Sequence, residues 1–176
     1  RGEKVRYQGE TFQMPLPDSE GKAIQIAHAA TELPIYLATL GPKSLQYTGE
    51  AANGWLGTSF SPDHPEAHLN FLSEGATRAA RSLADLGLCV SARIEIGEDV
   101  DAMIAKRKTA VAFNMGGMGS KKTNFYNDAF KRAGYSDDAL AIQTPWLEGK
   151  REEAAARVPD AMVTEFQILG TKDMIQ

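Results

Sequence analysis

An alternation of apolar strands and helices between residues 34 and 97 constrains the fold more than any other feature. It begins with "PIYLATLGPKSL", where a β-branched and aromatic run predicts a strand over 34–40 and Gly41-Pro42 opens a helix over about 43–52. "GWLGTSF" returns to an extended pattern, and "LCVSARIEIG" is a further strand rich in Val and Ile. Strands that alternate with helices in this way pair in parallel, so an α/β sheet or barrel is expected.

A long amphipathic helix is predicted between the last two of these strands, within residues 61–87. Its apolar positions recur at spacings of three and four: Leu69, Leu72, Ala76, Ala79, Leu83 and Leu86. Ser61 or Asp63 could cap its start, and Gly87 is expected to end it.

The regions on either side have a different character. Residues 4–16 alternate around Gln8-Gly9 and predict a short hairpin. Residues 98–176 predict a helical block, whose last segment carries an apolar stripe of Met162, Val163, Phe166 and Leu169. We therefore expect a single domain over 1–176, made of a hairpin and loop (1–33), a βαβαβ part (34–97) and a helical insertion and return (98–176). The first residue is not Met and the pattern starts abruptly, so we expect a piece of a longer protein.

Composition narrows the possible functions. The net charge of −4 argues against nucleic acid or an anionic membrane as the main partner. No apolar stretch approaches the ~20 residues that span a bilayer. Cys89 is the single cysteine and is expected to be a buried strand residue, which excludes a disulfide framework and favours a reducing, cytoplasmic setting.

The turn at residues 38–44 is the strongest candidate for a binding site. A strand that enters a helix through Gly-Pro-Lys-Ser leaves free backbone N–H groups at the helix start, which suit a phosphate or another anion. Gly41 allows close backbone approach, and Ser44 can add a hydroxyl. An ordinary capped turn explains the same residues, and the sequence alone leaves both interpretations open.

The remaining candidates are weaker. Thr58, Ser59 and Ser61 follow the next strand and should lie on the same rim. The stretch "NMGGMGSKKTNFYN" at 114–127 lacks the phosphate-loop spacing, so a mobile lid or an oligomer contact is expected there. His64 and His68 lie four residues apart but have no accompanying carboxylate motif, so a solvated helix start is favoured over a metal site. No complete catalytic set can be assembled from these residues.

Several of these stretches resemble the luciferase-like flavin and deazaflavin oxidoreductases, which are (β/α)8 barrels. The resemblance is carried by "PIYLATLGPKSLQYTGEAANGWL", "SPDHPEAHLNFLSEG", "FNMGGMGSKKTNFYNDAFKRAGY" and "VPDAMVTEFQILGTKDMI". The Gly-Gly-Met-Gly and Asn-Phe-Tyr-Asn combination is more similar to the branch that uses coenzyme F420. The resemblance implies a partial TIM barrel, in which 34–40, "GWLGTS" and "CVSARIEIG" are strands five to seven. Strands one to four and strand eight would then lie outside this chain.

The resemblance also implies an activity and a set of site residues. The activity is hydride transfer between reduced F420 and an organic substrate, with FMN as the alternative cofactor. Cofactor contacts are expected from Ala38, Leu40, Gly41, Pro42, Lys43 and Ser44, and substrate contacts from Thr58 and Ser61. This chain departs from the family pattern at two positions. Sugar-phosphate-oxidising members have a Lys where this chain has Ser61, and family members usually have an Asp where this chain has Asn53. The catalytic residues are not identified, because the N-terminal half of the barrel would contribute to them.

A second hypothesis comes from a different class of protein. The chain could be a catalytically inactive fragment or a subunit-contact module, because an open half-barrel exposes strand edges and apolar faces. It would then pair with a second copy, as a homodimer, or with the missing half of the barrel.

Overall fold

The computed structural model describes residues 4–25 and 32–175. These residues divide into two compact units, Arg1–Leu33 and Pro34–Gln176, which are treated separately here. In the first unit, β1 (Tyr7–Gln8) pairs antiparallel with β2 (Gln13–Met14), which confirms the predicted hairpin.

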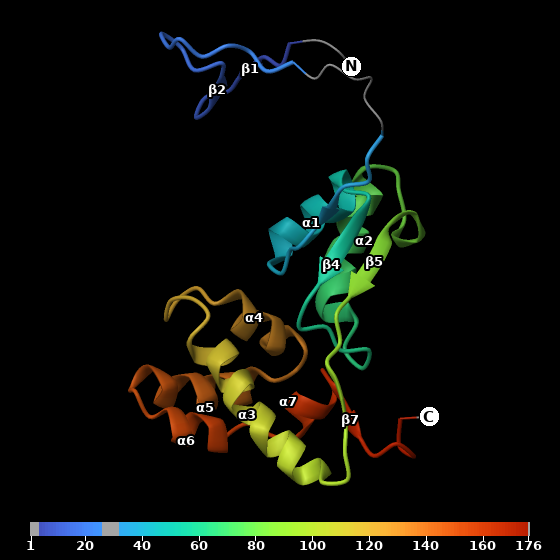
Figure 1. The fold of residues 1–176 in the computed structure, drawn as a ribbon, viewed down its shortest axis with the longest axis vertical. Coiled ribbons are helices and arrows are strands. Elements are labelled where there is room, and N and C mark those ends of the chain that lie inside the picture. The colour runs from blue at the N-terminus through green and yellow to red at the C-terminus, as the bar shows by residue number, and fades with distance from the viewer. Residues whose placement is uncertain (1–3, 26–31, 176) are drawn as a thin grey trace. The chain divides into compact units, whose positions relative to one another are not determined.

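The second unit begins with a parallel sheet that has the order β3-β4-β5 (Figure 1). β3 (Tyr36–Leu37) pairs with β4 (Gly54–Gly57), and β4 pairs with β5 (Gly87–Val90). The crossovers contain α1 (Pro42–Ala51) and α2 (Glu66–Arg78). The predicted alternation and the parallel pairing are therefore confirmed, although the first strand is shorter than 34–40.

The helices α1 and α2 approach so closely that glycine is required on both sides. A Cβ added to Gly49 would overlap the Leu72 carbonyl oxygen, and one added to Gly75 would overlap the carbonyl oxygen of Gln46. The contact buries Leu45, Leu72 and Ala76 around Trp55 and Leu86. This small core holds the two helices against the sheet.

The predicted end of α2 at Gly87 is wrong, because the helix stops at Arg78. Ala80 has a left-handed φ of 54°, and the N–H groups of Ala80 and Arg81 bond back to the carbonyls of Thr77 and Ala76. Ser82 and Asp85 then cap each other and start a separate 3-10 turn, Leu83–Asp85. Ala79 is exposed as a result, although Leu86 still reaches the core.

The predicted cap at the start of α2 is also wrong. Pro65 occupies the N-cap position and provides no side-chain hydrogen bond. The Ser61 hydroxyl instead accepts a hydrogen bond from the Asp63 N–H at 3.1 Å, within the preceding turn.

The third predicted strand divides in two. β5 ends at Val90, and β6 (Ile94–Ile96) pairs in parallel with β7 (Ile168–Gly170), in a separate two-stranded sheet. The prediction that the chain is helical through Gly170 is therefore wrong at its end. Cys89 lies on β5 as expected, but its side chain is exposed rather than buried.

The helical block lies between β6 and β7 and has its own core (Figure 1). Met115, Ile142 and Met162 are among its fully buried side chains. Its helices are α3 (Val100–Gly116), α4 (Phe125–Arg132), α5 (Ser136–Leu147), α6 (Arg151–Ala156) and α7 (Ala161–Thr164). Within the described part of the chain, none of the helices is long and apolar enough to cross a membrane.

The contact between α1 and α2 gives the first testable prediction. Gly75→Ala should lower the free energy of unfolding by about 2 kcal/mol or more, because the added methyl group has no space beside the Gln46 carbonyl. Asn70→Ala, on the exposed face of the same helix, is the matched control and should be neutral or slightly stabilising. Urea unfolding of both variants measures the difference. Equal stability of the two would contradict the close packing.

Candidate functional site

Residues 38–44, here called the lip, connect β3 to α1 at the carboxyl edge of the sheet. Gly41 is the N-cap residue of α1, Pro42 is its first residue, and no acidic side chain lies in the first turn. The Ser44 hydroxyl donates to the Gly41 carbonyl at 2.9 Å. Because Gly41 has no side chain with which to cap the helix, the first N–H groups of α1 have no side-chain acceptor from it. This helix start therefore favours a negatively charged group.

Hydrogen bonds to two buried side chains, Trp55 and Thr48, fix the backbone of the lip. The Trp55 indole N–H donates to the Thr39 carbonyl at 2.9 Å, and the hydroxyls of Thr39 and Thr48 lie 2.7 Å apart. Trp55 and Thr48 are both fully buried. The lip is thus attached to the interior of the sheet and to the middle of α1.

The lip forms one wall of a pocket of about 420 Å³, here called the lip pocket. A second wall comes from the start of α4, where the Phe125 ring packs directly on Gly41, 3.2 Å from the position that a Cβ there would take. The residues that line the pocket are Ala38, Thr39, Leu40, Gly41, Ser44, Leu56, Thr58, Phe125 and Tyr126. Most of these side chains are apolar, so the pocket suits a flat apolar group next to an anion.

The lip pocket contains most of the residues predicted to bind the cofactor, but not all of them. Pro42 and Lys43 do not line it, and the Lys43 side chain is exposed. Thr58 does line it, whereas Ser61 is buried in its own turn and lies outside the lining. Phe125 and Tyr126 were not anticipated. Their position just after the capping residue Asn124 does not predict a contact with the lip.

The stretch at 114–127, predicted to be a lid or a contact loop, has side chains that fix both of its ends. The Asn124 oxygen accepts from the N–H groups of Tyr126 and Asn127, and its amide donates to the carbonyls of Asn114 and Met115. The Asn127 amide also donates to the Met115 carbonyl, at 3.0 Å. These two buried asparagines join the end of α3 to the start of α4, and so place Phe125 and Tyr126 at the pocket.

A second pocket, of about 260 Å³, lies next to the lip pocket and shares Thr58 with it. We call it the arginine pocket, because Arg93 and Arg107 line it and no carboxylate does. Arg107 pairs with Glu95 through one terminal nitrogen, while its Nε is buried without a hydrogen-bond partner. Its other lining residues are Ser59, Ser91, Ala110, Val111, Asn114, Phe130, Met162, Phe166 and Gln167. The donors and the positive charge suit an oxygen-rich or anionic group.

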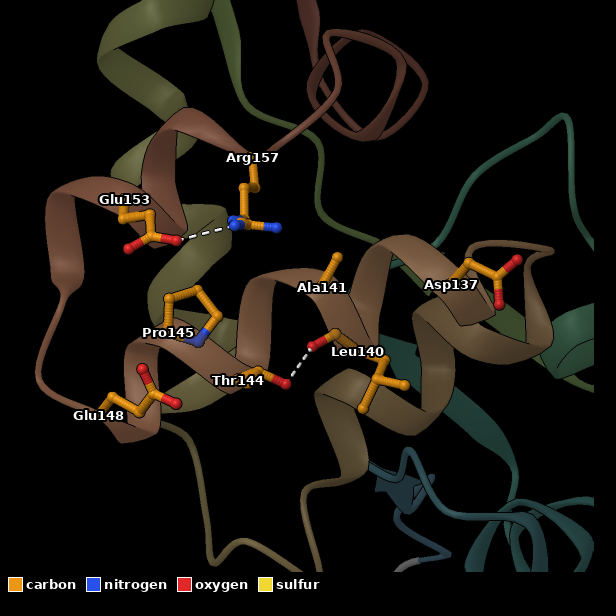
Figure 2. Close-up of a pocket in the computed structure, with 8 residues that line it drawn as sticks. All are labelled: Asp137, Leu140, Ala141, Thr144, Pro145, Glu148, Glu153 and Arg157. Carbon is orange, nitrogen blue, oxygen red and sulfur yellow. Dashed lines mark hydrogen bonds and ion pairs between the residues drawn. The ribbon is translucent and has the colours of Figure 1, made fainter.

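Another hollow, of about 490 Å³, lies away from the strand ends, between α5 and α6 (Figure 2). Its polar groups already bond one another: the Arg157 guanidinium donates to Glu153 at 2.8 Å, and the Thr144 hydroxyl donates to the Leu140 carbonyl at 2.9 Å. Asp137 and Glu148 add further negative charge at its ends. It lies away from the carboxyl edge of the sheet, and the one cation among the described residues that line it is already paired with Glu153, so it is not the candidate site.

The expectation of a solvated helix start at His64 and His68 is wrong for His68. His68 is 1% exposed, its ring lies 5.4 Å from that of Trp55, and neither of its nitrogens has a hydrogen-bond partner. His64 is partly exposed, and its Nε2 lies 3.2 Å from a Glu165 oxygen. Among the described residues, no group of three or more His, Cys, Asp or Glu side chains could hold a metal ion.

The fold and the site can now be compared with known proteins. The sequence model of the luciferase-like monooxygenase family matches residues 1–176, so the chain belongs to this family. The predicted family resemblance is therefore confirmed.

Individual relatives fall in the F420-dependent branch of the family. The Mycobacterium tuberculosis protein Rv3520c, provisionally named a coenzyme F420-dependent oxidoreductase, is 33% identical over 100% of this chain and 53% of its own length. The 5,10-methylenetetrahydromethanopterin reductase of Methanopyrus kandleri is 29% identical over 99% of this chain and 47% of its own length. The chain thus spans about half the length of the curated relatives it matches.

A solved structure supports the α/β fold. The coenzyme F420-dependent tetrahydromethanopterin reductase from Methanopyrus kandleri superposes with a TM-score of 0.70 at 27% identity. The match covers 99% of this chain and 47% of the solved chain.

The buried His68 gives a prediction about pH. Burial and the nearby Arg132 charge lower the pKa of His68 from 6.5 to about 4. The unfolded chain therefore binds a proton more readily than the folded one, and stability should fall as the pH falls through 6.5 towards 4. Urea unfolding at pH 7 and pH 4.5 should show a loss of about 2 kcal/mol from this group.

The matched variants for this measurement lie on the same helix. His68→Met removes the titrating ring and should remove that part of the pH dependence. Leu72→Met changes another fully buried residue of α2 but keeps the histidine, so it should keep the dependence. If His68→Met loses as much stability between pH 7 and pH 4.5 as the wild type does, His68 is not the source of this pH dependence.

Proposed function

We propose that this chain forms the cofactor-binding part of an F420-dependent oxidoreductase, which transfers a hydride between reduced F420 and an organic substrate. The lip pocket is the observation that carries this proposal. A helix start without acids lies beside apolar walls from the sheet and from α4, which fits a flat deazaflavin ring and a negatively charged side chain. The relatives named for F420 support the choice of this coenzyme.

In this proposal the coenzyme supplies the hydride chemistry, and the chain supplies binding and orientation. Ala38, Leu40, Leu56 and Phe125 provide apolar contacts for the ring. The N–H groups at the start of α1 would bind oxygen atoms of the cofactor side chain, while the Ser44 hydroxyl holds the Gly41 carbonyl in place. Pro42 sets the direction of the first helical turn, and Lys43 adds positive charge at the exposed side of the lip.

The arginine pocket is the proposed substrate compartment. It adjoins the lip pocket at Thr58, so a substrate there would lie beside the cofactor. Arg93, Arg107 and the hydroxyls of Ser59 and Ser91 favour a substrate that carries an anionic or oxygen-rich group. A direct substrate contact from Ser61, as the resemblance implied, is not part of this proposal because that side chain is buried.

The strands leave an apolar face that fits the rest of a barrel. Tyr36 and Leu56 lie on the face of the sheet opposite to Trp55, and each is more than 40% exposed. We propose that β3, β4 and β5 are strands five to seven of a (β/α)8 barrel, and that the missing strands cover this face. A homodimer that covers the same face, and an inactive fragment that binds no cofactor, are the alternatives.

Cofactor binding to the protein expressed from its complete gene tests the proposal directly. Titration calorimetry should detect binding of F420 and much weaker binding of FMN. Oxygen-dependent turnover with FMN alone would support an FMN-dependent monooxygenase instead. A protein that binds neither compound would support the inactive-fragment alternative.

A substitution in the lip tests the position of the site. Gly41→Val should weaken F420 binding at least tenfold, about 1.4 kcal/mol, because the new side chain projects towards the Phe125 ring and fills the lip pocket. Ala51→Val adds the same side chain at the exposed end of α1 and should bind F420 normally. Unchanged affinity in Gly41→Val would mean that the lip is an ordinary capped turn.

A further inference from the structure

Arg132, at the end of α4, connects the helical block to the βαβ part of the second unit. Its Nε donates to the Ala67 carbonyl at 3.0 Å, and its Nη2 donates to the Leu40 carbonyl at 2.9 Å. The guanidinium carbon also lies 5.7 Å from the centre of the Phe71 ring. One side chain therefore contacts the lip and the first two turns of α2.

The surroundings of Arg132 make this arrangement specific. Burial lowers the pKa of the guanidinium, and in the described part of the chain no carboxylate forms an ion pair with it. Its two acceptors are backbone carbonyls, whose spacing a planar guanidinium can match and a single ammonium cannot. The neighbouring His68 is buried without a partner, and its lowered pKa of about 4 keeps it uncharged at neutral pH.

Both ends of α4 reach the same site. Arg132, at the carboxyl end, binds the carbonyl of Leu40, the residue that precedes Gly41. Phe125, the first residue of the helix, packs on Gly41, and both residues line the lip pocket. At 1.5 Å per residue the Arg132 and Phe125 positions lie about 10 Å apart along the helix axis. A shift of the lip relative to Arg132 therefore changes the contact between Gly41 and the Phe125 ring, and with it the shape of the pocket that both line.

We propose that Arg132 is a positioning residue that holds the lip against the Phe125 ring, and so sets the shape of the cofactor pocket. This inference rests on the proposed function for its ligand, but the geometry concerns only side chains of this chain. Arg132 does not line the lip pocket, so it acts through the backbone of Leu40 rather than by touching the cofactor.

A double-mutant cycle on F420 affinity tests this role. Arg132→Met should weaken F420 binding about tenfold, and Arg132→Lys should recover part of the loss, because an ammonium can reach one carbonyl. In a Phe125→Ala background, Arg132→Met should cost less than threefold, because the ring against which it holds the lip is gone. Arg151→Met is the matched control, since Arg151 lies 5.4 Å from the Trp146 ring, outside the residues that line the lip pocket. It should leave the affinity unchanged.

A second measurement needs no cofactor. The Trp55 indole binds the Thr39 carbonyl in the lip, and its contribution to the emission is the difference between each protein and the same protein carrying Trp55→Phe. Arg132→Met should loosen the lip and increase acrylamide quenching of Trp55 about twofold, whereas Arg151→Met should not.

The two measurements separate this inference from the proposed function. A wild-type protein that does not bind F420 contradicts the proposed function, and the quenching of Trp55 still decides the role of Arg132. The inference is overturned if Arg132→Met leaves the quenching of Trp55 unchanged. It is also overturned if Arg132→Met lowers the affinity for F420 by the same factor with and without Phe125. The latter result would assign Arg132 a general structural role.

Discussion

The parallel pairing of β4 with both of its neighbours is the constraint on which the candidate site depends. Asn53 begins this pairing: its N–H donates to the Ile35 carbonyl, its side-chain oxygen accepts from the Ile35 N–H, and its carbonyl accepts from Gly87. Because all three strands run in the same direction, the lip, Thr58 and Ser91 leave the sheet at one edge. The family resemblance implies Asp at this position, and Asn53 keeps the acceptor oxygen of that side chain without its charge.

The sequence predicts the part of the fold that repeats regularly and misses the places where local capping overrides the pattern. The apolar spacing within 61–87 continues past the true end of α2, because Leu83 and Leu86 still face the core after the chain has turned. The interruption comes from Ser82 and Asp85, whose mutual cap starts a new turn. In the same way β7 follows a helical apolar stripe without a break in composition, and only its pairing with β6 defines it as a strand.

The candidate site shows a similar division. The lip could be predicted because strand, glycine, proline and helix follow one another within a few residues. Its second wall could not, because Phe125 reaches the lip only through the two asparagines that join α3 to α4. The expectation that His68 is solvated fails for a related reason. Its place near a helix start suggests solvent, whereas the rings of Trp55 and Phe60 enclose it once the sheet has formed.

The use of a buried arginine to join the helical block to the lip has a physical cost and a specific benefit. An apolar residue at position 132 would avoid the desolvation of a charge and could even stabilise the fold. It would not, however, bind the Leu40 carbonyl, which is a hydrogen-bond acceptor at the rim of the pocket. Apolar contacts tolerate small shifts, whereas two hydrogen bonds from one rigid guanidinium define a single separation. A pocket that must match a flat ring beside the lip and Phe125 gains more from a defined shape than from additional stability.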